Sequence, residues 1–154
     1  MKLLILLMFA ASFSLFAQWH EVPLPNNYPV FNDIKFVNDS VGIIVGDSGT
    51  VLRTTNGGLS WGNLSDIPIK DLKSISAIKK HFYVSGNSGC IIESSNLGES
   101  WNSIPFQFQT NLSGIFFIDT LNGYVVGESS IFKTTNKGGN WTNQTFENTF
   151  FRSV

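Results

Sequence analysis

The sequence predicts an all-β fold in which a four-stranded antiparallel unit recurs along the chain. An eight-residue segment that ends in tryptophan occurs three times, and its tryptophans, Trp61, Trp101 and Trp141, follow one another at intervals of 40 residues. Short apolar runs separated by Asn, Asp, Ser and Gly fill the intervals, which is typical of strands joined by tight turns. A repeat of about 40 to 45 residues with four short strands is the pattern of a β-propeller blade.

Residues 1–17 predict a secretory signal peptide. Lys2 is followed by the apolar run Leu3–Phe9 and then by small residues, which correspond to the basic, hydrophobic and cleavage regions of such a segment. A membrane anchor is the alternative, but it needs about 18 or more apolar residues, and Ser12 and Ser14 interrupt this run. We therefore expect an exported protein that is secreted, periplasmic or on the cell surface, with no stable membrane insertion after cleavage.

Residues 18–154 are predicted to form one propeller domain that opens with the outer strand of a blade. Trp19 precedes Trp61 by 42 residues and so has the same place in the repeat as the later tryptophans. We interpret residues 19–25 as the outermost strand of a closing blade, whose other strands lie at the far C-terminus of the propeller.

The first repeat, residues 31–70, predicts four short strands. The runs 34–37, 41–45 and 50–53 supply three of them, and the fourth starts at Trp61. The runs are apolar at nearly every position, which is expected when neighbouring blades cover both faces of a sheet.

The second and third repeats follow the same plan with shorter turns. Residues 72–109 contain runs at 74–78, 82–85 and 90–93, and residues 112–149 contain runs at 115–118, 123–126 and 130–133. The first turn of the second repeat is one residue shorter, and so is the turn Glu128-Ser129 of the third.

The three repeats and their flanking strands supply about three blades, whereas a closed propeller has roughly 4 to 8. Unclosed repeats expose apolar faces and unpaired edges. A fourth repeat starts at Phe150 and stops at Val154. We therefore expect an incomplete propeller, the N-terminal part of a longer protein whose missing C-terminal part supplies the remaining blades. The alternative is a self-contained chain that closes its ring with a second copy.

The repeated eight-residue segment predicts a hairpin corner. An Asn side chain can hydrogen-bond the backbone two residues on, and a Gly two residues later can take a positive φ. The Ser hydroxyls can bond nearby backbone, while the indoles can cover the corner and reach between blades. The predicted corner residues are Thr54, Asn56, Gly58, Ser60 and Trp61, then Ser94, Asn96, Gly98, Ser100 and Trp101, and then Thr134, Asn136, Gly138 and Trp141.

These corners resemble the Asp-box, or bacterial neuraminidase repeat, whose pattern is Ser/Thr-x-Asp-x-Gly-x-Ser/Thr-Trp. Sialidases, sortilin, xyloglucanases and photosystem II assembly-factor-like propellers contain it. The run 46–58 is most similar to the last group, with its Gly-x-x-Gly-x-Ile-x-x-Thr-x-Asp-Gly-Gly, and the resemblance covers residues 19–154. All three corners have Asn in place of Asp, and Asn140 replaces the second Ser/Thr. Asn keeps the acceptor that forms the turn, so we expect the corners to keep the structural role that the resemblance implies.

The sequence shows no complete catalytic constellation. The resemblance to sialidases implies a clamp of three arginines, whereas this chain has only Arg53 and Arg152. A glycosidase needs two suitably separated acids, but turns are the usual place of Asp, and we assign none of the candidates to catalysis. These candidates are Asp33, Asp39, Asp47, Asp66, Asp71, Asp119 and Glu128.

The remaining reactive side chains predict neither a metal site nor a cofactor. His20 and His81 are isolated from other ligand residues, which favours surface imidazoles. Cys90 takes the position of Thr50 and Ser130 at the start of the third strand, where we expect a small buried side chain rather than a cross-linking thiol.

The leading functional hypothesis is an exported, non-catalytic propeller that binds or scaffolds a protein or glycan ligand. The alternative is a carbohydrate-active hydrolase, similar to sialidases or xyloglucanases, whose catalytic residues lie beyond residue 154. Without Lys2 the chain has 9 basic and 11 acidic residues, a balance that provides no basic field for nucleic acid.

Overall fold

Three four-stranded antiparallel sheets form the described part of the chain. The computed structural model describes residues 21–22, 24, 30–64, 67–68 and 70–145, and every structural statement below refers to them. The predicted all-β fold of four-stranded antiparallel blades is confirmed. The predicted signal segment 1–17, most of the closing strand 19–25 and residues 150–154 lie outside the described residues. Within the described part, no helix is long and apolar enough to cross a membrane.

Each sheet is a meander in which every strand pairs with the next one along the chain. The first sheet contains β1 (Phe31–Phe36), β2 (Gly42–Gly46), β3 (Val51–Thr54) and β4 (Gly62–Asn63). The second contains β5 (Leu72–Ile78), β6 (His81–Gly86), β7 (Cys90–Ser94) and β8 (Asn102–Ser103). The third contains β9 (Gly114–Phe117), β10 (Gly123–Gly127), β11 (Ser130–Thr134) and β12 (Thr142–Thr145). The short 3-10 turns η1 (Asp47–Gly49) and η2 (Asn87–Gly89) join the second and third strands of the first two sheets.

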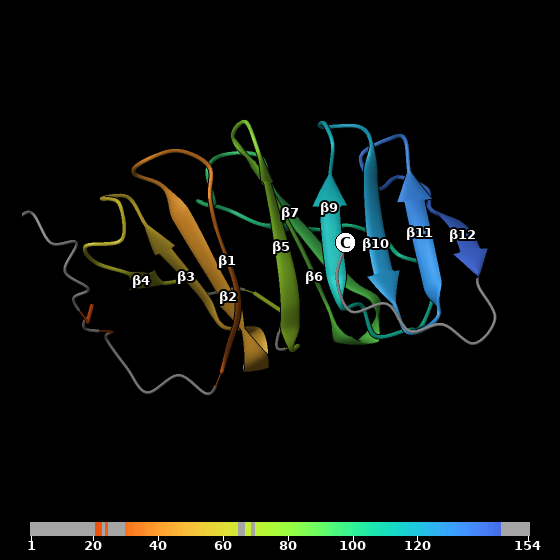
Figure 1. The fold of residues 1–154 in the computed structure, drawn as a ribbon, viewed down its shortest axis with the longest axis horizontal. Helices are drawn as coiled ribbons and strands as arrows, with labels where there is room; N and C mark the ends of the chain where they lie inside the picture. The colour runs from red at the N-terminus through yellow and green to blue at the C-terminus, as the bar shows by residue number, and fades with distance from the viewer. Residues whose placement is uncertain (1–20, 23, 25–29, 65–66, 69, 146–154) are drawn as a thin grey trace, which may run out of the picture.

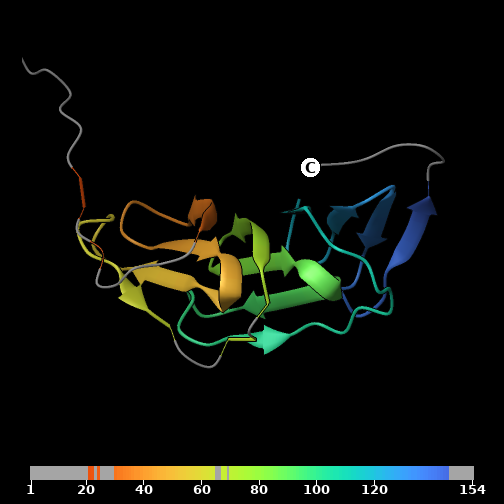
Figure 2. The ribbon, with the colours of Figure 1, turned by 90° about the horizontal axis from the view of Figure 1, so that it is seen from below.

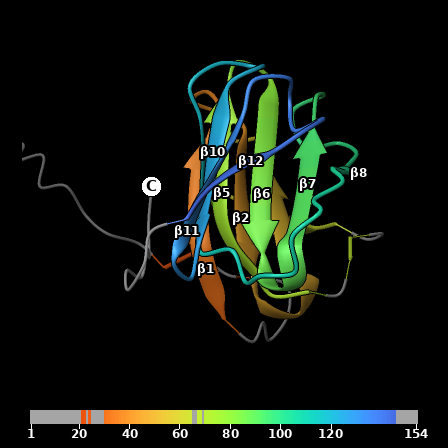
Figure 3. The same cartoon turned by 90° about the vertical axis from the view of Figure 1, so that its right-hand side faces the viewer.

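The three sheets lie side by side in chain order (Figure 1). Their first strands are neighbours, since β5 contacts both β1 and β9. From these inner strands the sheets fan out, so that β4, β8 and β12 point in different directions (Figure 2). Figure 3, seen from the side of the third sheet, shows the sheets stacked one behind another. The side of the molecule formed by β1, β5 and β9 is called the axial side below.

The second sheet is buried on both faces, which explains why its strands are apolar at nearly every position. Successive side chains of a strand point to opposite faces. Val84 and Ile92 pack against the first sheet, whereas Tyr83 and Ile91 pack against the third. All four are 2% exposed or less. Neighbouring blades therefore cover both faces of the second sheet, as its apolar runs predict.

In each sheet one phenylalanine packs against the tryptophan of that sheet's own corner. The ring comes from the first strand in sheets one and three, but from the second strand in sheet two. The facing pairs are Phe36 with Gly42, Ala77 with Phe82, and Phe117 with Gly123. A Cβ on Gly42 would lie 2.7 Å from the Phe36 ring, so only one of the two facing positions can hold a ring. The exchange in the second sheet therefore keeps one ring and one small residue in each facing pair.

The Ser85 hydroxyl is buried without a hydrogen-bond partner among the described residues. Val45 and Val126 hold the equivalent positions in the other two sheets. A buried hydroxyl without a partner is destabilising, so Ser85→Val is expected to raise the free energy of unfolding by about 1 kcal/mol, measured by urea denaturation. Ser85→Ala is the control, because it removes the hydroxyl without adding volume. A loss of stability in both variants would contradict the prediction.

Candidate functional site

The eight-residue corners close through hydrogen bonds within each corner. The Thr54 hydroxyl accepts a hydrogen bond from the Gly58 N–H (2.9 Å) and donates one to Asn56 Oδ1 (2.9 Å). Asn56 Oδ1 also accepts one from the Ser60 N–H at 3.0 Å. The same bonds recur among Ser94, Asn96, Gly98 and Ser100 in the second corner and among Thr134, Asn136, Gly138 and Asn140 in the third.

The Asn side chain of each corner bonds a backbone N–H four residues on, rather than two as the sequence argument expected. The reason is that the N–H two residues on, which belongs to the corner Gly, already donates a hydrogen bond to the Ser or Thr hydroxyl at the start of the corner. Asn140 contributes its backbone N–H to the third corner. An Asn at this position therefore leaves the bond to Asn136 Oδ1 intact.

The corners also join neighbouring sheets. Arg53 Nε in the first sheet donates a hydrogen bond to the Leu97 carbonyl in the second corner (2.8 Å). Trp101 is half-buried against the core between the first and second sheets, and Trp141 is buried in the core between the second and third. None of the predicted corner residues lines the axial cleft described below. Within the described part, the corners are elements of blade packing.

A second contact between the blades uses the 3-10 turns and was not predicted from the sequence. In η1 the Ser48 N–H donates to Asp71 Oδ1 (3.1 Å) and the Gly49 N–H donates to the Lys70 carbonyl (2.7 Å). In η2 the N–H groups of Ser88 and Gly89 donate to Asn111 Oδ1 and to the Thr110 carbonyl in the same way. The sequence signal for this contact was the pair Asp71 and Asn111, which lie 40 residues apart, each just before a new blade.

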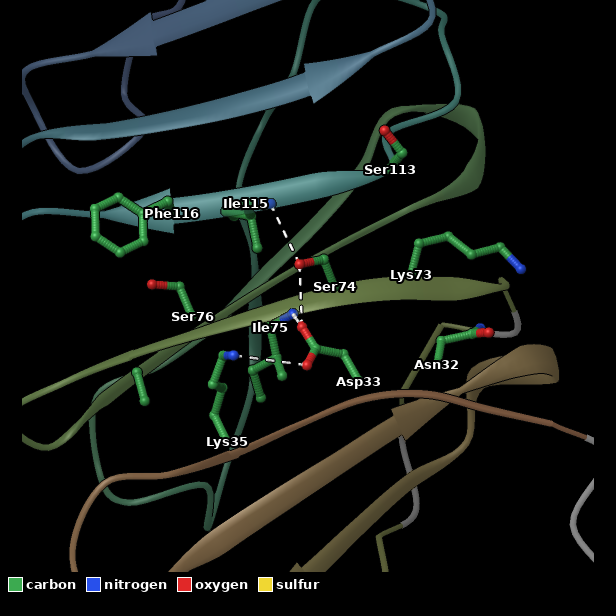
Figure 4. Close-up of a pocket in the computed structure, with 11 residues that line it drawn as sticks. Asn32, Asp33, Lys35, Lys73, Ser74, Ile75, Ser76, Ser113, Ile115 and Phe116 are labelled. Atoms are coloured by element: carbon green, nitrogen blue, oxygen red, sulfur yellow. Dashed lines mark hydrogen bonds and ion pairs between the residues drawn. The ribbon is translucent and has the colours of Figure 1, made fainter. Parts of the chain in front are cut away.

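The axial side has a cleft of about 570 Å³, which Figure 4 shows in close-up. Its walls come from the first strands of all three sheets. Asn32, Asp33 and Lys35 contribute from β1, Lys73, Ser74, Ile75, Ser76 and Ala77 from β5, and Ser113, Ile115 and Phe116 from β9 and the residue before it. The cleft therefore brings together side chains that lie about one blade repeat apart in the sequence.

Side-chain hydrogen bonds hold the three inner strands together along the cleft. Asp33 Oδ2 accepts hydrogen bonds from the Ile75 N–H (3.0 Å) and from the Ser74 hydroxyl (3.2 Å). The Ser74 oxygen in turn accepts one from the Ile115 N–H (3.4 Å). Ser76 Oγ accepts one from the Phe117 N–H (3.0 Å). Asp33 is thus a link between blades within β1, not a turn residue.

At one end of the cleft, Lys73 is committed to a carboxylate. Lys73 Nζ lies 2.6 Å from Asp47 Oδ1 and 3.8 Å from Asp71 Oδ2. Asp47 Oδ1 also accepts a hydrogen bond from Asn32 Nδ2 at 2.7 Å. The hydrogen bonds from Lys73 and Asn32 lower the pKa of Asp47 below its ordinary value of 3.8.

Lys73→Met is expected to raise the pKa of Asp47 back toward 3.8, measured by NMR titration of the carboxyl carbon. The pKa of Asp119 is the internal control: it is lowered by hydrogen bonds from the Asn122 side chain and from the N–H groups of Asn122 and Leu121, not by Lys73. Because both folded-state values lie below 3.8, these carboxylates stabilise the fold above that pH, and the stabilisation is lost as the pH falls through the folded values. An unchanged Asp47 titration would contradict the assignment.

The other candidates from the sequence occupy separate places. Asp39, Asp71, Asp119 and Glu128 lie in turns or loops, whereas Asp66, His20 and Arg152 lie outside the described residues. His81 is half-buried and stacks on Tyr83, and burial lowers the pKa of His81. Cys90 is half-buried at the start of β7, where burial raises the pKa of its thiol. The described residues contain no group of three His, Cys, Asp or Glu that could hold a metal ion.

The sequence model of the family described as Photosynthesis system II assembly factor YCF48 matches residues 11–149. The chain belongs to this family. The resemblance to Asp-box propellers of the photosystem II assembly-factor-like group is thereby confirmed. No curated protein matches the sequence.

Solved structures show the same fold. YCF48 from Cyanidioschyzon merolae is 26% identical, with a TM-score of 0.75 over 85% of this chain and 42% of that one. A structure of YCF48 bound to D1 peptide is 21% identical, with a TM-score of 0.76 over 83% of this chain and 43% of that one. The GH74 xyloglucanase from Xanthomonas campestris is 12% identical, with a TM-score of 0.52 over 67% of this chain and 18% of that one, which shows similarity of fold alone. The chain thus spans less than half the length of the two YCF48 structures.

Proposed function

We propose that this YCF48-family propeller binds an extended segment of a partner protein in its axial cleft and catalyses no reaction. The observation that carries the proposal is the cleft itself, whose size falls in the range of about 300–1,000 Å³ that is common for ligand sites. A family structure bound to D1 peptide supports a peptide as the ligand of this chain. The charged groups Asp33 and Lys73 favour binding over catalysis, because both are committed to contacts between blades.

A peptide fits the cleft better than a glycan does. Glycan sites use aromatic rings as stacking platforms, whereas Phe116 is the one aromatic residue among those that line this cleft in the described part of the chain. The walls instead provide hydroxyl and ammonium groups from β1 and β5, which suit the carbonyl and carboxylate groups of a peptide. Glycan binding is therefore kept as an alternative result of the experiment described next.

The test is selection from a displayed library of random heptapeptides on the purified protein. Enriched peptides should bind the wild-type protein and lose about tenfold in affinity for Phe116→Ser, since the ring is removed from the cleft wall. Leu121→Ser is the matched control, because Leu121 is 48% exposed and Phe116 49%, but Leu121 lies outside the cleft. Three results would overturn the proposal. The selection could enrich no peptide, the enriched peptides could bind both variants as tightly as the wild-type protein, or the protein could bind oligosaccharides alone.

We further propose that the protein acts outside the cytoplasm, which the signal-like pattern of residues 1–17 supports. The mature protein recovered from a producing cell is expected to begin at Gln18. N-terminal sequencing of that protein checks the cleavage site, and a mature chain that still begins with Met1 would overturn the proposal.

A further inference from the structure

Three side chains of different chemistry occupy the same position in three successive blades. In the inner strands, Lys35 pairs with Ile43, Ser76 with Tyr83, and Phe116 with Tyr124, and these are equivalent positions of the three ladders. Figure 4 shows Lys35, Ser76 and Phe116 in a row across the cleft. We call these three residues the axial row. The row offers an ammonium, a hydroxyl and an aromatic ring in that order.

Each member of the axial row has a donor or an apolar surface that is not used in contacts within the protein. The Lys35 side chain is 51% exposed, and its Nζ lies 3.8 Å from Asp33 Oδ1, a long contact that occupies at most one of three N–H donors. Ser76 is only 3% exposed but lines the cleft. Its hydroxyl accepts a hydrogen bond from the Phe117 N–H, and its own O–H has no acceptor among the described residues. The ring of Phe116 is 49% exposed.

The neighbouring polar groups of the cleft are already committed. Asp33 Oδ2 accepts two hydrogen bonds from the second blade, and its Oδ1 accepts one from the Ile34 N–H. Ser74 both donates and accepts between blades. Lys73 is paired with Asp47. A ligand therefore finds its donors at Lys35 and Ser76 and its apolar surface at Phe116.

We infer that the axial row recognises a peptide that presents a carboxylate to Lys35 and Ser76 and an apolar side chain to Phe116. The inference rests on the proposed function. A carboxylate accepts hydrogen bonds from both an ammonium and a hydroxyl, and bonds to an ionised group are the stronger ones. Asp33 repels an anion placed beside it, so the carboxylate binds on the side of Lys35 that faces Ser76. In an extended peptide, side chains two residues apart point the same way and stand about 7 Å apart. Ser76 on β5 and Phe116 on β9 belong to contacting strands, so a carboxylate bound between Lys35 and Ser76 leaves the apolar side chain two residues away at Phe116.

The test uses three short peptides and NMR titration of the full mature chain. Ac-Glu-Ala-Phe-NH2 carries both groups, Ac-Gln-Ala-Phe-NH2 lacks the charge, and Ac-Glu-Ala-Ala-NH2 lacks the ring. The first peptide is expected to shift the signals of Lys35, Ser76 and Phe116 and to bind about tenfold tighter than either of the others. Lys35→Gln should abolish the preference for Glu over Gln, while Lys133→Gln, on β11 away from the cleft, should preserve it.

The outcomes separate this inference from the proposed function. Equal binding of the Glu and Gln peptides, or a preference for Glu that survives Lys35→Gln, overturns the carboxylate assignment. If library-selected peptides bind in the cleft but the three short peptides leave the axial row unshifted, the inference fails and the proposed function stands. If no peptide of either kind binds in the cleft, both fail. Because Lys35 is exposed, Lys35→Gln is expected to fold, which circular dichroism checks.

Discussion

Trp141→Ala is expected to lower the free energy of unfolding by about 3–5 kcal/mol, the cost of truncating a buried tryptophan. Trp141 is 3% exposed and packs edge-to-face on two rings, Phe106 at 5.8 Å and Phe117 at 6.4 Å between centroids. Removal of the indole leaves a cavity in the core between the second and third sheets. Urea denaturation followed by circular dichroism measures the loss.

Trp61→Ala is the matched control, since Trp61 holds the same place in the first corner. Trp61 is half-buried, and among the described residues its one ring contact is with Phe36 at a centroid distance of 5.9 Å. The expected loss is about 1–2 kcal/mol, because less apolar surface is exposed to water by the truncation. Equal losses for the two variants would show that the tryptophans act within their corners and not between blades.

Gly86→Ala is expected to destabilise the fold by about 3 kcal/mol, the upper end of the usual cost of overpacking. A Cβ at Gly86 would lie 2.2 Å from the Asp71 carbonyl oxygen and 3.0 Å from the Leu72 Cα. Both atoms belong to the main chain just before and within β5, so no side-chain rotation relieves the overlap. The backbone must separate there, which strains the hydrogen bond from the Asn87 N–H to the Asp71 carbonyl (2.9 Å).

Gly62→Ala provides the comparison for Gly86→Ala. A Cβ at Gly62 would have its nearest neighbour, the Arg53 carbonyl oxygen, at 3.9 Å, an ordinary contact distance. Its expected effect is within about 1 kcal/mol, as for most exposed positions. Thermal unfolding of the two variants side by side measures the difference. Similar melting temperatures would mean that the strands at Gly86 separate freely.

The corners show how much of this fold was predictable from local sequence. The hydrogen bonds of the first corner all lie within a span of seven residues and join Thr54, Asn56, Gly58 and Ser60. The types and spacing of these residues therefore predict the turn before any tertiary contact is known. Recurrence of that pattern every 40 residues then predicts the number of blades in the described part. The near-continuous apolar runs predict sheets that are covered on both faces, because water is excluded from both sides of such a strand.

The candidate site was not predictable in the same way. Lys35, Ser76 and Phe116 differ in chemistry and carry no shared motif, so nothing in their local sequence connects them. They meet because strands that start successive blades become neighbours around the axis. For the same reason Asp33, which sequence reasoning grouped with turn residues, links two blades, and Gly86 is required by a close approach rather than by a turn.

The amino-acid sequence on its own determines the corner, the four-stranded unit and its repetition, because the interactions that form them join residues close together in the chain. The tertiary structure decides which tryptophan is buried, which glycine has no room for a side chain and which three residues line the axial row. These properties depend on how one blade packs against the next, across about 40 residues of chain. Local propensity carries no information on that packing, because the packing forms only when the apolar faces of separate sheets are buried against one another, away from water.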